Sequence, residues 1–378
     1  MNHADVVVIG AGASGLAAGA TLGALGREPV LLERDARVGG TWDRRYERLC
    51  LHTVRQFSGL PHLPMPGSFP RYVPKGMYAQ YLRDYAPRME LDVRTGQEVE
   101  RIQRAAGPND GWLVRTKTDE WQADALVIAT GQYHTPRLPK WPGAESFRGR
   151  LLHASEYRTG RAFAGKRVLV VGIGNTGAEI AADLVEQGAA SVAIAVRSSP
   201  PVTKREIFGI PVQFFGMALM PFPPGPVDRA GAVLRRIGTG DLGRYRIGPA
   251  AWGPFTARRP PVIDVGFLEQ LEAGTVTVRP EVTGFTPDGV AFADGNREPF
   301  DVVIAATGYT TGLERVLNEP VVLDERGRPR PGAGSRIGFF SIGFAESPRG
   351  QLFETSRAAP KIAAAIDRYL NRTTGARS

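Results

Sequence analysis

Val6-Val7-Val8-Ile9-Gly10-Ala11-Gly12-Ala13-Ser14-Gly15 is the stretch that decides the fold of this chain. Its apolar run predicts a buried strand, and the G-x-G-x-x-G spacing is typical of the turn into the first helix of a dinucleotide-binding domain. Gly10 permits the tight turn, Gly12 lets the backbone approach a pyrophosphate, and Gly15 lets helix and strand pack closely. We expect the pyrophosphate over the helix N-terminus, whose free N–H groups favour negative charge.

An acidic residue follows the next predicted strand. The first helix is expected to end near Leu25, and the apolar run from Pro29 to Leu32 predicts the strand after it. Glu33 comes directly after that strand, where a carboxylate can accept hydrogen bonds from the ribose hydroxyls of a dinucleotide. The sequence therefore predicts a first dinucleotide site that includes Ser14, Glu33 and Arg34 beside the glycines.

The same pattern occurs a second time in the chain. Val168-Leu169-Val170-Val171 precedes Gly172-Ile173-Gly174-Asn175-Thr176-Gly177, and a helix is expected from there to about Gln187. The following strand, Ser191 to Val196, ends in Arg197-Ser198 in place of an acid. An arginine can pair bidentately with a 2′-phosphate that an acid would repel. The second site is therefore predicted to take NADPH rather than NADH, with Arg197 as the main determinant.

Two such modules in one chain predict two bound dinucleotides. FAD and NADPH are the expected pair, because one must bring electrons in and the other must store them. Cys50 is the single cysteine, which excludes a C-x-x-C redox pair and with it the disulfide reductases. The predicted fold is α/β, with two Rossmann-like domains, the second inserted in the first. We expect residues 1–157 and 301–378 to form the FAD-binding domain, and residues 158–300 the NADPH-binding domain.

Composition limits the other classes of function. The chain has 378 residues and a net charge of +9, but its Arg and Lys are spread along the sequence, so no nucleic-acid partner is expected. Residues 6–26 carry no charge, yet they contain glycines throughout and lack a preceding positive region. No targeting signal and no membrane span are predicted, and a cytoplasmic protein is expected. A homodimer is compatible with the sequence.

The other expected elements are less regular. In the first part of the chain we predict a helix over 77–86 and strands near Val93, near Leu113 and over 125–129. Residues 198–262 are expected to form long loops with one helix near 229–237. After them we predict a β-meander over 276–300, a strand over 302–306 and a closing helix over 358–370.

A signature lies between the two glycine motifs. Phe147, Gly149, His153 and Tyr157 match the F-x-G-x-x-x-H-x-x-x-[YF] pattern of the flavin-containing monooxygenases, which this sequence resembles. The resemblance implies that these residues fix the hinge between the domains. Further similar segments are Gly39-Gly40-Thr41-Trp42 as a flavin-side loop, and Ala129-Thr130-Gly131 and Ala306-Thr307-Gly308-Tyr309 as the segments that carry the chain between domains.

Within that family the chain is most similar to the YUCCA-type enzymes. The segments that carry this likeness are 48–52, 55–57, 69–72, 205–209, 261–266 and 343–344. Many members of the family place an asparagine beside the flavin C4a position. Here His52 stands in that place, as in YUCCA-like sequences, and is the candidate catalytic residue.

The resemblance implies a flavin C4a-(hydro)peroxide as the oxygenating species. Our leading hypothesis is a small-molecule monooxygenase that uses molecular oxygen to decarboxylate an aromatic 2-oxo acid such as indole-3-pyruvate. Arg55, Lys204 and Arg205 are the candidate cations for the substrate carboxylate. One alternative is N- or S-oxygenation of an amine, oxime or thioether, in natural-product tailoring or detoxification. The second is an NADPH-flavin reductase that serves a partner. No metal site is expected.

Overall fold

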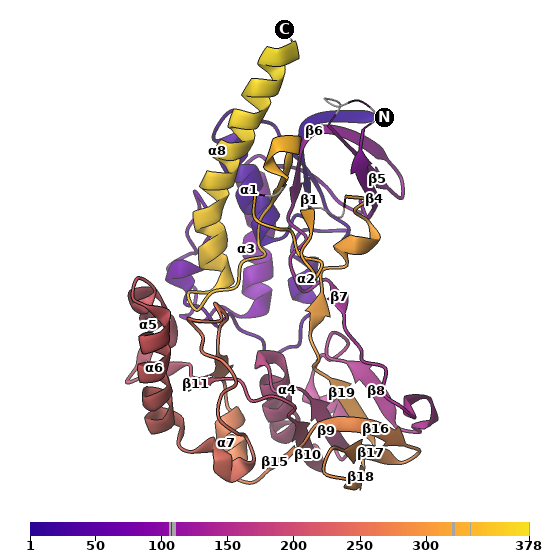
Figure 1. Cartoon of the computed structure of the whole chain (residues 1–378), viewed down its shortest axis with the longest axis vertical. Helices are drawn as coiled ribbons and strands as arrows, with labels where there is room; N and C mark the ends of the chain where they lie inside the picture. Colours follow the sequence, from indigo (N-terminus) through magenta and orange to yellow (C-terminus); the bar gives the residue numbers. More distant parts are fainter. Residues whose placement is uncertain (106, 108–110, 320–321, 333, 378) are drawn as a thin grey trace.

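The computed structural model describes residues 1–105, 107, 111–319, 322–332 and 334–377, and it contains two parallel β-sheets arranged along the long axis of the molecule (Figure 1). The first sheet lies in the upper half of the view and the second in the lower half. Each sheet begins its first βαβ unit with one of the two glycine motifs, so the predicted α/β class is confirmed.

The first sheet is mainly parallel. Its order is β3 (Asp92–Arg94), β2 (Val30–Leu32), β1 (Asn2–Ile9), β6 (Glu120–Ile128), β5 (Trp112–Thr116) and β4 (Val99–Arg104), and β21 (Phe339–Ser341) also pairs with β6. Only β5 and β4 run antiparallel to their neighbours among the described strands of this sheet. Strand β1 therefore lies in the interior of the sheet, which explains the apolar run Val6–Ile9 in its buried C-terminal half.

Both faces of the first sheet are covered. Val6 and Val8 face α1 (Ala13–Gly23), α3 (Lys75–Arg88) and α8 (Gln351–Arg377), whereas Val7 and Ile9 point to the opposite face. Side chains alternate between faces along a strand, so one short apolar run supplies both cores. The C-terminal end of β1, with its glycine turn, is consequently held between two packed layers.

The second sheet is parallel throughout. Its order is β15 (Val276–Arg279), β10 (Ser191–Ala195), β9 (Arg167–Val171), β19 (Val302–Ala305) and β8 (Arg150–His153). Helices α4 (Asn175–Glu186) and α7 (Phe267–Glu272) cover one face, and a three-stranded meander covers the other. The meander strands are β16 (Val282–Thr286), β17 (Gly289–Phe292) and β18 (Arg297–Pro299).

The chain crosses between the sheets at a short two-stranded ribbon. Strand β7 (Thr135–Pro136) leaves the first domain and pairs antiparallel with β20 (Tyr309–Thr310), which returns to it. Strands β8 and β19 both belong to the second sheet, although the expected boundaries at 157 and 301 assigned them to the FAD-binding parts. We propose that the second domain runs from about residue 137 to about residue 308, because strands joined in one sheet share a core.

The segment expected to be mostly loop contains two helices. Strand β11 (Val202–Lys204) pairs with β14 (Val262–Asp264), and between them lie the ribbon of β12 (Glu206–Ile207) and β13 (Ile210–Pro211) and the helices α5 (Val212–Leu219) and α6 (Pro224–Thr239). These helices stand at the left edge of Figure 1. Prolines at the start of α6 suggested loop, but the first helical turn tolerates proline. The residues that helix α5 buries are Gln213 and Gly216, so its sequence shows no apolar core-facing side that would predict a helix.

Two further expectations need correction. Strand β15 pairs with β10 in the parallel sheet, so only residues 282–299 form the meander. The closing helix α8 begins at Gln351, earlier than expected, and contains Pro360. No described helix is long and apolar enough to cross a membrane.

Candidate active site

A cavity of about 570 Å³ lies between the two domains. Both glycine turns reach it, the first through residues 11–14 and the second through residues 174–176. Its other walls come from the loop at 39–42, the segment at 129–133 and the crossing residues Gly308 and Tyr309. One hollow thus touches the C-terminal ends of β1 and β9, which is where open α/β sheets bind their ligands.

The first turn has the geometry that its glycines predict. Gly10 has a φ of +97°, and a Cβ on Gly15 would lie only 1.8 Å from the Gly10 carbonyl oxygen. A Cβ on Gly12, in contrast, would meet no atom within 4 Å. Gly10 and Gly15 are therefore required by the fold, whereas Gly12 leaves open space beside the start of α1.

The second turn repeats this geometry closely. Gly172 has a φ of +107°, and a Cβ on Gly177 would lie 1.9 Å from the Gly172 carbonyl oxygen. Gly174 again has nothing within 4 Å of its Cβ position. Each domain therefore presents an open cradle at a helix N-terminus, which fits the pyrophosphate of a dinucleotide.

An unpaired hydroxyl also marks the cavity as a ligand site. The Thr130 Oγ1 atom is buried without a hydrogen-bond partner in the described structure, and Thr130 lines the cavity together with Gly131. Buried polar groups in native proteins are usually satisfied. A bound cofactor would supply the missing partner, so the residues present fit a flavin dinucleotide on this side.

Glu33 is held at the cavity wall by backbone groups. The Ala11 N–H donates to Glu33 Oε2 at 2.8 Å, and the Asp35 N–H donates to Oε1 at 3.0 Å. Burial raises the pKa of Glu33, while these two backbone bonds lower it. Arg34 turns away from the cavity, and its guanidinium Nη1 donates to His134 Nε2 at 2.7 Å.

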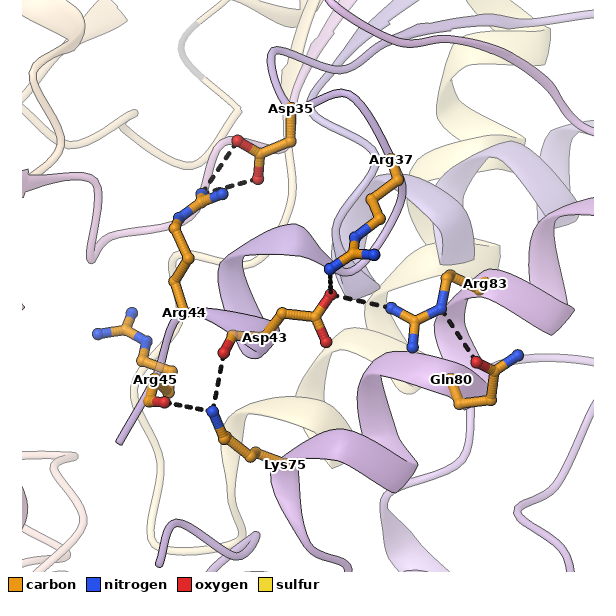
Figure 2. Close-up of polar contacts among 8 residues, drawn as sticks. All are labelled: Asp35, Arg37, Asp43, Arg44, Arg45, Lys75, Gln80 and Arg83. Atoms are coloured by element: carbon orange, nitrogen blue, oxygen red, sulfur yellow. Dashed lines mark hydrogen bonds and ion pairs between the residues drawn. The ribbon is translucent and has the colours of Figure 1, made fainter. Parts of the chain in front are cut away.

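An ionic network fixes the loop at 39–42, which lines the cavity (Figure 2). Asp43 closes the short helix α2 (Gly40–Asp43), and its carboxylate pairs with Arg37 and Arg83, each at 3.0 Å. Lys75 Nζ donates to the carbonyl oxygen of Asp43 at 2.8 Å and also to that of Arg45. Helix α3, which supplies Lys75 and Arg83, thereby holds Gly40, Thr41 and Trp42 at the cavity.

Asp43→Asn is expected to lower the free energy of unfolding of the holoenzyme by about 1 kcal/mol, because it removes the charge shared by two arginines. Urea denaturation followed by flavin fluorescence measures this change. Asp288→Asn is the matched control, since Asp288 pairs with Arg148 where both side chains are more than three-quarters exposed. Equal effects of the two substitutions would contradict an anchoring role for Asp43.

His153 joins the second sheet to the returning segment. Its Nδ1 accepts from the Ser155 N–H at 3.1 Å, so Nε2 carries the hydrogen and donates to the Gly308 carbonyl oxygen at 3.1 Å. Burial lowers the pKa of His153, which favours this neutral form. The ring also meets Tyr309 edge-on, with centroids 5.0 Å apart. These contacts lie beside the β7–β20 ribbon and support the hinge role that the resemblance implies.

The other signature residues lie in or beside the core of the second domain: Tyr157 is buried, whereas Phe147 and Gly149 are half-buried. The Tyr157 hydroxyl donates to Asp183 Oδ2 at 2.5 Å, and its ring stacks on Phe163. Phe147 packs edge-on against Phe285 beneath the meander. A Cβ on Gly149 would lie 2.7 Å from the backbone oxygen of Asp301, so glycine is required there.

The predicted phosphate determinants are exposed at the end of β10. Arg197 and Ser198 both face solvent, and Arg197 has one distant ion pair, with Glu281 at 3.8 Å. Its side chain is 70% exposed, so the guanidinium is available to an incoming phosphate. Thr307 lies in the segment that returns to the first domain, and its hydroxyl donates to the carbonyl oxygen of Arg137 in the segment that leaves it.

The three candidate substrate cations do not line the cavity in the described structure. Arg55 donates to the Phe69 carbonyl at 2.6 Å, and Arg205 donates to the Leu51 carbonyl at 2.7 Å while stacking on Tyr72. Lys204 is exposed on β11. Two other cations line the cavity instead, Arg45 and Arg259. Sequence reasoning missed them because no motif surrounds either one.

His52 lines the cavity. Its Nε2 contacts the carboxylate of Glu179 on α4. The described residues hold no group of His, Cys, Asp and Glu side chains that could bind a metal ion.

Two nucleotide-binding folds around one shared cavity define a two-dinucleotide flavoprotein oxidoreductase. The family described as pyridine nucleotide-disulphide oxidoreductase matches residues 7–207. The rice indole-3-pyruvate monooxygenase YUCCA1 is 38% identical, over 93% of this chain and 89% of its own length. The probable indole-3-pyruvate monooxygenase YUCCA4 of Arabidopsis thaliana is 34% identical, over 94% and 88%.

The solved structures agree with these relatives. A flavin-containing monooxygenase from Stenotrophomonas maltophilia superposes with a TM-score of 0.74 at 25% identity, covering 98% of this chain and 99% of that one. The chain belongs to the flavin-containing monooxygenase family and is a flavin-dependent enzyme. Within the family it is similar to the YUCCA-type members. A bacillithiol disulfide reductase from Staphylococcus aureus shares only the fold, with a TM-score of 0.71 at 16% identity.

Proposed function

We propose that this protein is an FAD- and NADPH-dependent monooxygenase that converts an aromatic 2-oxo acid, such as indole-3-pyruvate, to the acid one carbon shorter. The overall reaction consumes the 2-oxo acid, O2, NADPH and a proton, and yields the shortened acid, CO2, NADP⁺ and water. The observation that carries the proposal is the single cavity reached by both glycine turns. The names of the YUCCA relatives support the substrate class.

Each cofactor has a set of residues suited to hold it. The first turn, Glu33, the loop at 40–42 and Thr130 would hold FAD, and the second turn with Arg197 and Ser198 would hold NADPH. Bound FAD would take up the hydride of NADPH and activate oxygen. The protein itself positions the two nucleotides, excludes water and offers hydrogen-bonding groups at the shared cavity.

Two arginines at the cavity favour an anionic substrate. Arg259 is half-exposed, stacks on Trp252, and has its nearest carboxylate, that of Glu346, at 3.6 Å. Arg45 donates to the Tyr309 hydroxyl at 2.9 Å, and its guanidinium pairs with no carboxylate in the described structure. Either guanidinium has donors left for a substrate carboxylate.

The proposal is tested by product analysis with the purified holoenzyme under ¹⁸O2. With indole-3-pyruvate, we expect one ¹⁸O atom in the shortened acid and one CO2 for each NADPH consumed. Sulfoxide from a thioether, with no acid from the 2-oxo acid, would instead establish the S-oxygenase alternative. Hydrogen peroxide as the only oxygen product, with every candidate substrate, would favour the reductase alternative.

Arg197→Ala is expected to raise KM for NADPH by roughly 10- to 100-fold, since a hydrogen bond to a charged group contributes about 1.5–3 kcal/mol. KM for NADH should stay nearly constant, because NADH has no 2′-phosphate. Steady-state reduction with both nucleotides measures the difference. Arg148→Ala is the control, because the Arg148 side chain is similarly exposed, at 77%, but Arg148 does not follow strand β10. Equal effects on both nucleotides would refute the assignment of Arg197.

A further inference from the structure

A side-chain pair bridges the two domains at the cavity. His52 comes from the loop after α2 in the first domain, and Glu179 lies on α4, two residues past the second glycine motif. Their contact joins His52 Nε2 to Glu179 Oε1. The Glu179 side chain is only 2% exposed, whereas that of His52 is 22% exposed and lines the cavity.

Burial makes the Glu179 carboxylate an unusual choice at this position. A buried charge costs several kcal/mol unless it is paired and hydrogen-bonded. Helix α4 would be better served by an apolar residue if packing were the only requirement. The position of Glu179 therefore points to a task for its carboxylate toward the residues that face it.

Several polar groups surround the pair. Burial and then the Glu179 carboxylate raise the pKa of Tyr46 well above its usual value. Arg48 reaches the backbone oxygen of Glu179 and pairs with Glu186 at 3.2 Å. Cys50 and Arg205 also lie close enough to interact electrostatically with the Glu179 carboxylate. The Tyr46 hydroxyl also hydrogen-bonds the Glu179 carboxylate, and Tyr46 lines the cavity, but Tyr46 is only 5% exposed. The imidazole of His52 is the more accessible of the two partners, with 22% of its side chain exposed.

We propose that Glu179 is the positioning residue for His52. Its carboxylate accepts the Nε2–H of His52, which fixes the tautomer and the plane of the ring and leaves Nδ1 for the cavity. Nδ1 has no other partner in the described structure, so it accepts a hydrogen bond when the ring is neutral and donates one when the ring is charged. The catalytic use of Nδ1 rests on the proposed function, but the pairing itself does not.

The contact between His52 and Glu179 also depends on the relative orientation of the two domains. The two residues lie in different domains, so a rotation of the second domain against the first would separate them. His52 is then correctly oriented only while the second glycine turn faces the cavity. A carboxylate that orients an imidazole in this way is a known device for holding one nitrogen ready for proton exchange.

The pairing is tested first without any substrate. ¹⁵N-histidine spectra of the flavin-loaded protein should show a protected Nε2–H signal that His52→Asn removes. Glu179→Leu should remove or strongly shift the same signal, because the acceptor is lost. Glu179→Gln, which keeps an acceptor oxygen in place, is the conservative variant and should retain it. An unchanged signal in Glu179→Leu would overturn the proposed pairing.

A double-mutant cycle then tests whether Glu179 acts through His52. Glu179→Leu should lower kcat by at least about 10-fold with little change in KM, as expected when a residue orients an acid–base group. The same change in the His52→Asn background should have no further effect. Additive losses would contradict the positioning role. Glu186→Gln, on the same helix but 43% exposed, is the control and should leave kcat unchanged.

The two experiments separate the two proposals. If no 2-oxo acid is oxygenated, the proposed function fails, yet the spectra still decide the pairing. The cycle would then use the rate of oxidation of whichever substrate the holoenzyme accepts.

Discussion

Gly12→Val is expected to give a folded protein that does not retain flavin. Gly12 has a φ of −75° and a ψ of −174°, a conformation that valine adopts readily. Its side chain would enter the open space beside the start of α1, where nothing lies within 4 Å. The valine would occupy the cradle and push a pyrophosphate away from the N–H groups of the helix. The loss of even two charge-assisted bonds of about 1.5–3 kcal/mol each weakens binding at least about 100-fold.

The ratio of flavin absorbance to protein absorbance in purified Gly12→Val, together with its circular dichroism, measures the effect. Gly23→Val is the matched control, because Gly23 lies on the same helix with the same open surroundings but does not line the cavity. Gly15→Ala should fail differently, by unfolding, since its Cβ would meet the Gly10 oxygen at 1.8 Å. A normal yellow Gly12→Val protein would overturn the assignment of the first turn.

Gly174→Val is expected to leave flavin bound while lowering kcat/KM for NADPH by at least about 100-fold, for the same physical reason. Gly174 has a φ of −78° and a ψ of 178°, and its Cβ would also point into open space. Stopped-flow reduction by NADPH measures the loss. Reduction by dithionite, which needs no nucleotide site, should proceed as in the unmodified enzyme.

The two glycine variants act as controls for each other. If each turn serves a different nucleotide, Gly12→Val loses flavin and Gly174→Val keeps it. Loss of flavin in both variants would show that the domains do not bind their nucleotides separately. Normal NADPH reduction in Gly174→Val would refute the assignment of the second turn.

Local sequence was sufficient for the two turns. A positive φ at Gly10 and Gly172 and the close approach at Gly15 and Gly177 depend on residues within one βαβ unit. The spacing of glycines therefore predicted both turns, both neighbouring helices and the α/β class. The acid at position 33 was predicted on the same local grounds, and the structure places it at the cavity.

The sequence was less informative where packing decides. Helix α5 buries Gln213 and Gly216 instead of an apolar side, and α6 begins in a proline-rich segment, so their region was expected to be mostly loop. The expected boundaries at 157 and 301 leave strands β8 and β19 outside the second domain that we propose, because neither short strand carries a sign of which sheet it joins. Arg55, Lys204 and Arg205 were chosen by charge, yet none of them lines the cavity in the described structure: Arg55 and Arg205 donate to backbone carbonyls, and Lys204 is exposed.

What the sequence by itself determined is the pair of nucleotide-binding turns, since backbone conformation and glycine spacing are local properties. Only the tertiary structure decided which side chains meet in the cavity. Arg259 comes from the long excursion between β11 and β14, and Glu179 reaches His52 from the other domain. Such contacts join residues that are far apart in sequence, and they arise from how whole sheets and helices pack. No local pattern records that packing, so the cavity and its inter-domain pair became visible only in the folded chain.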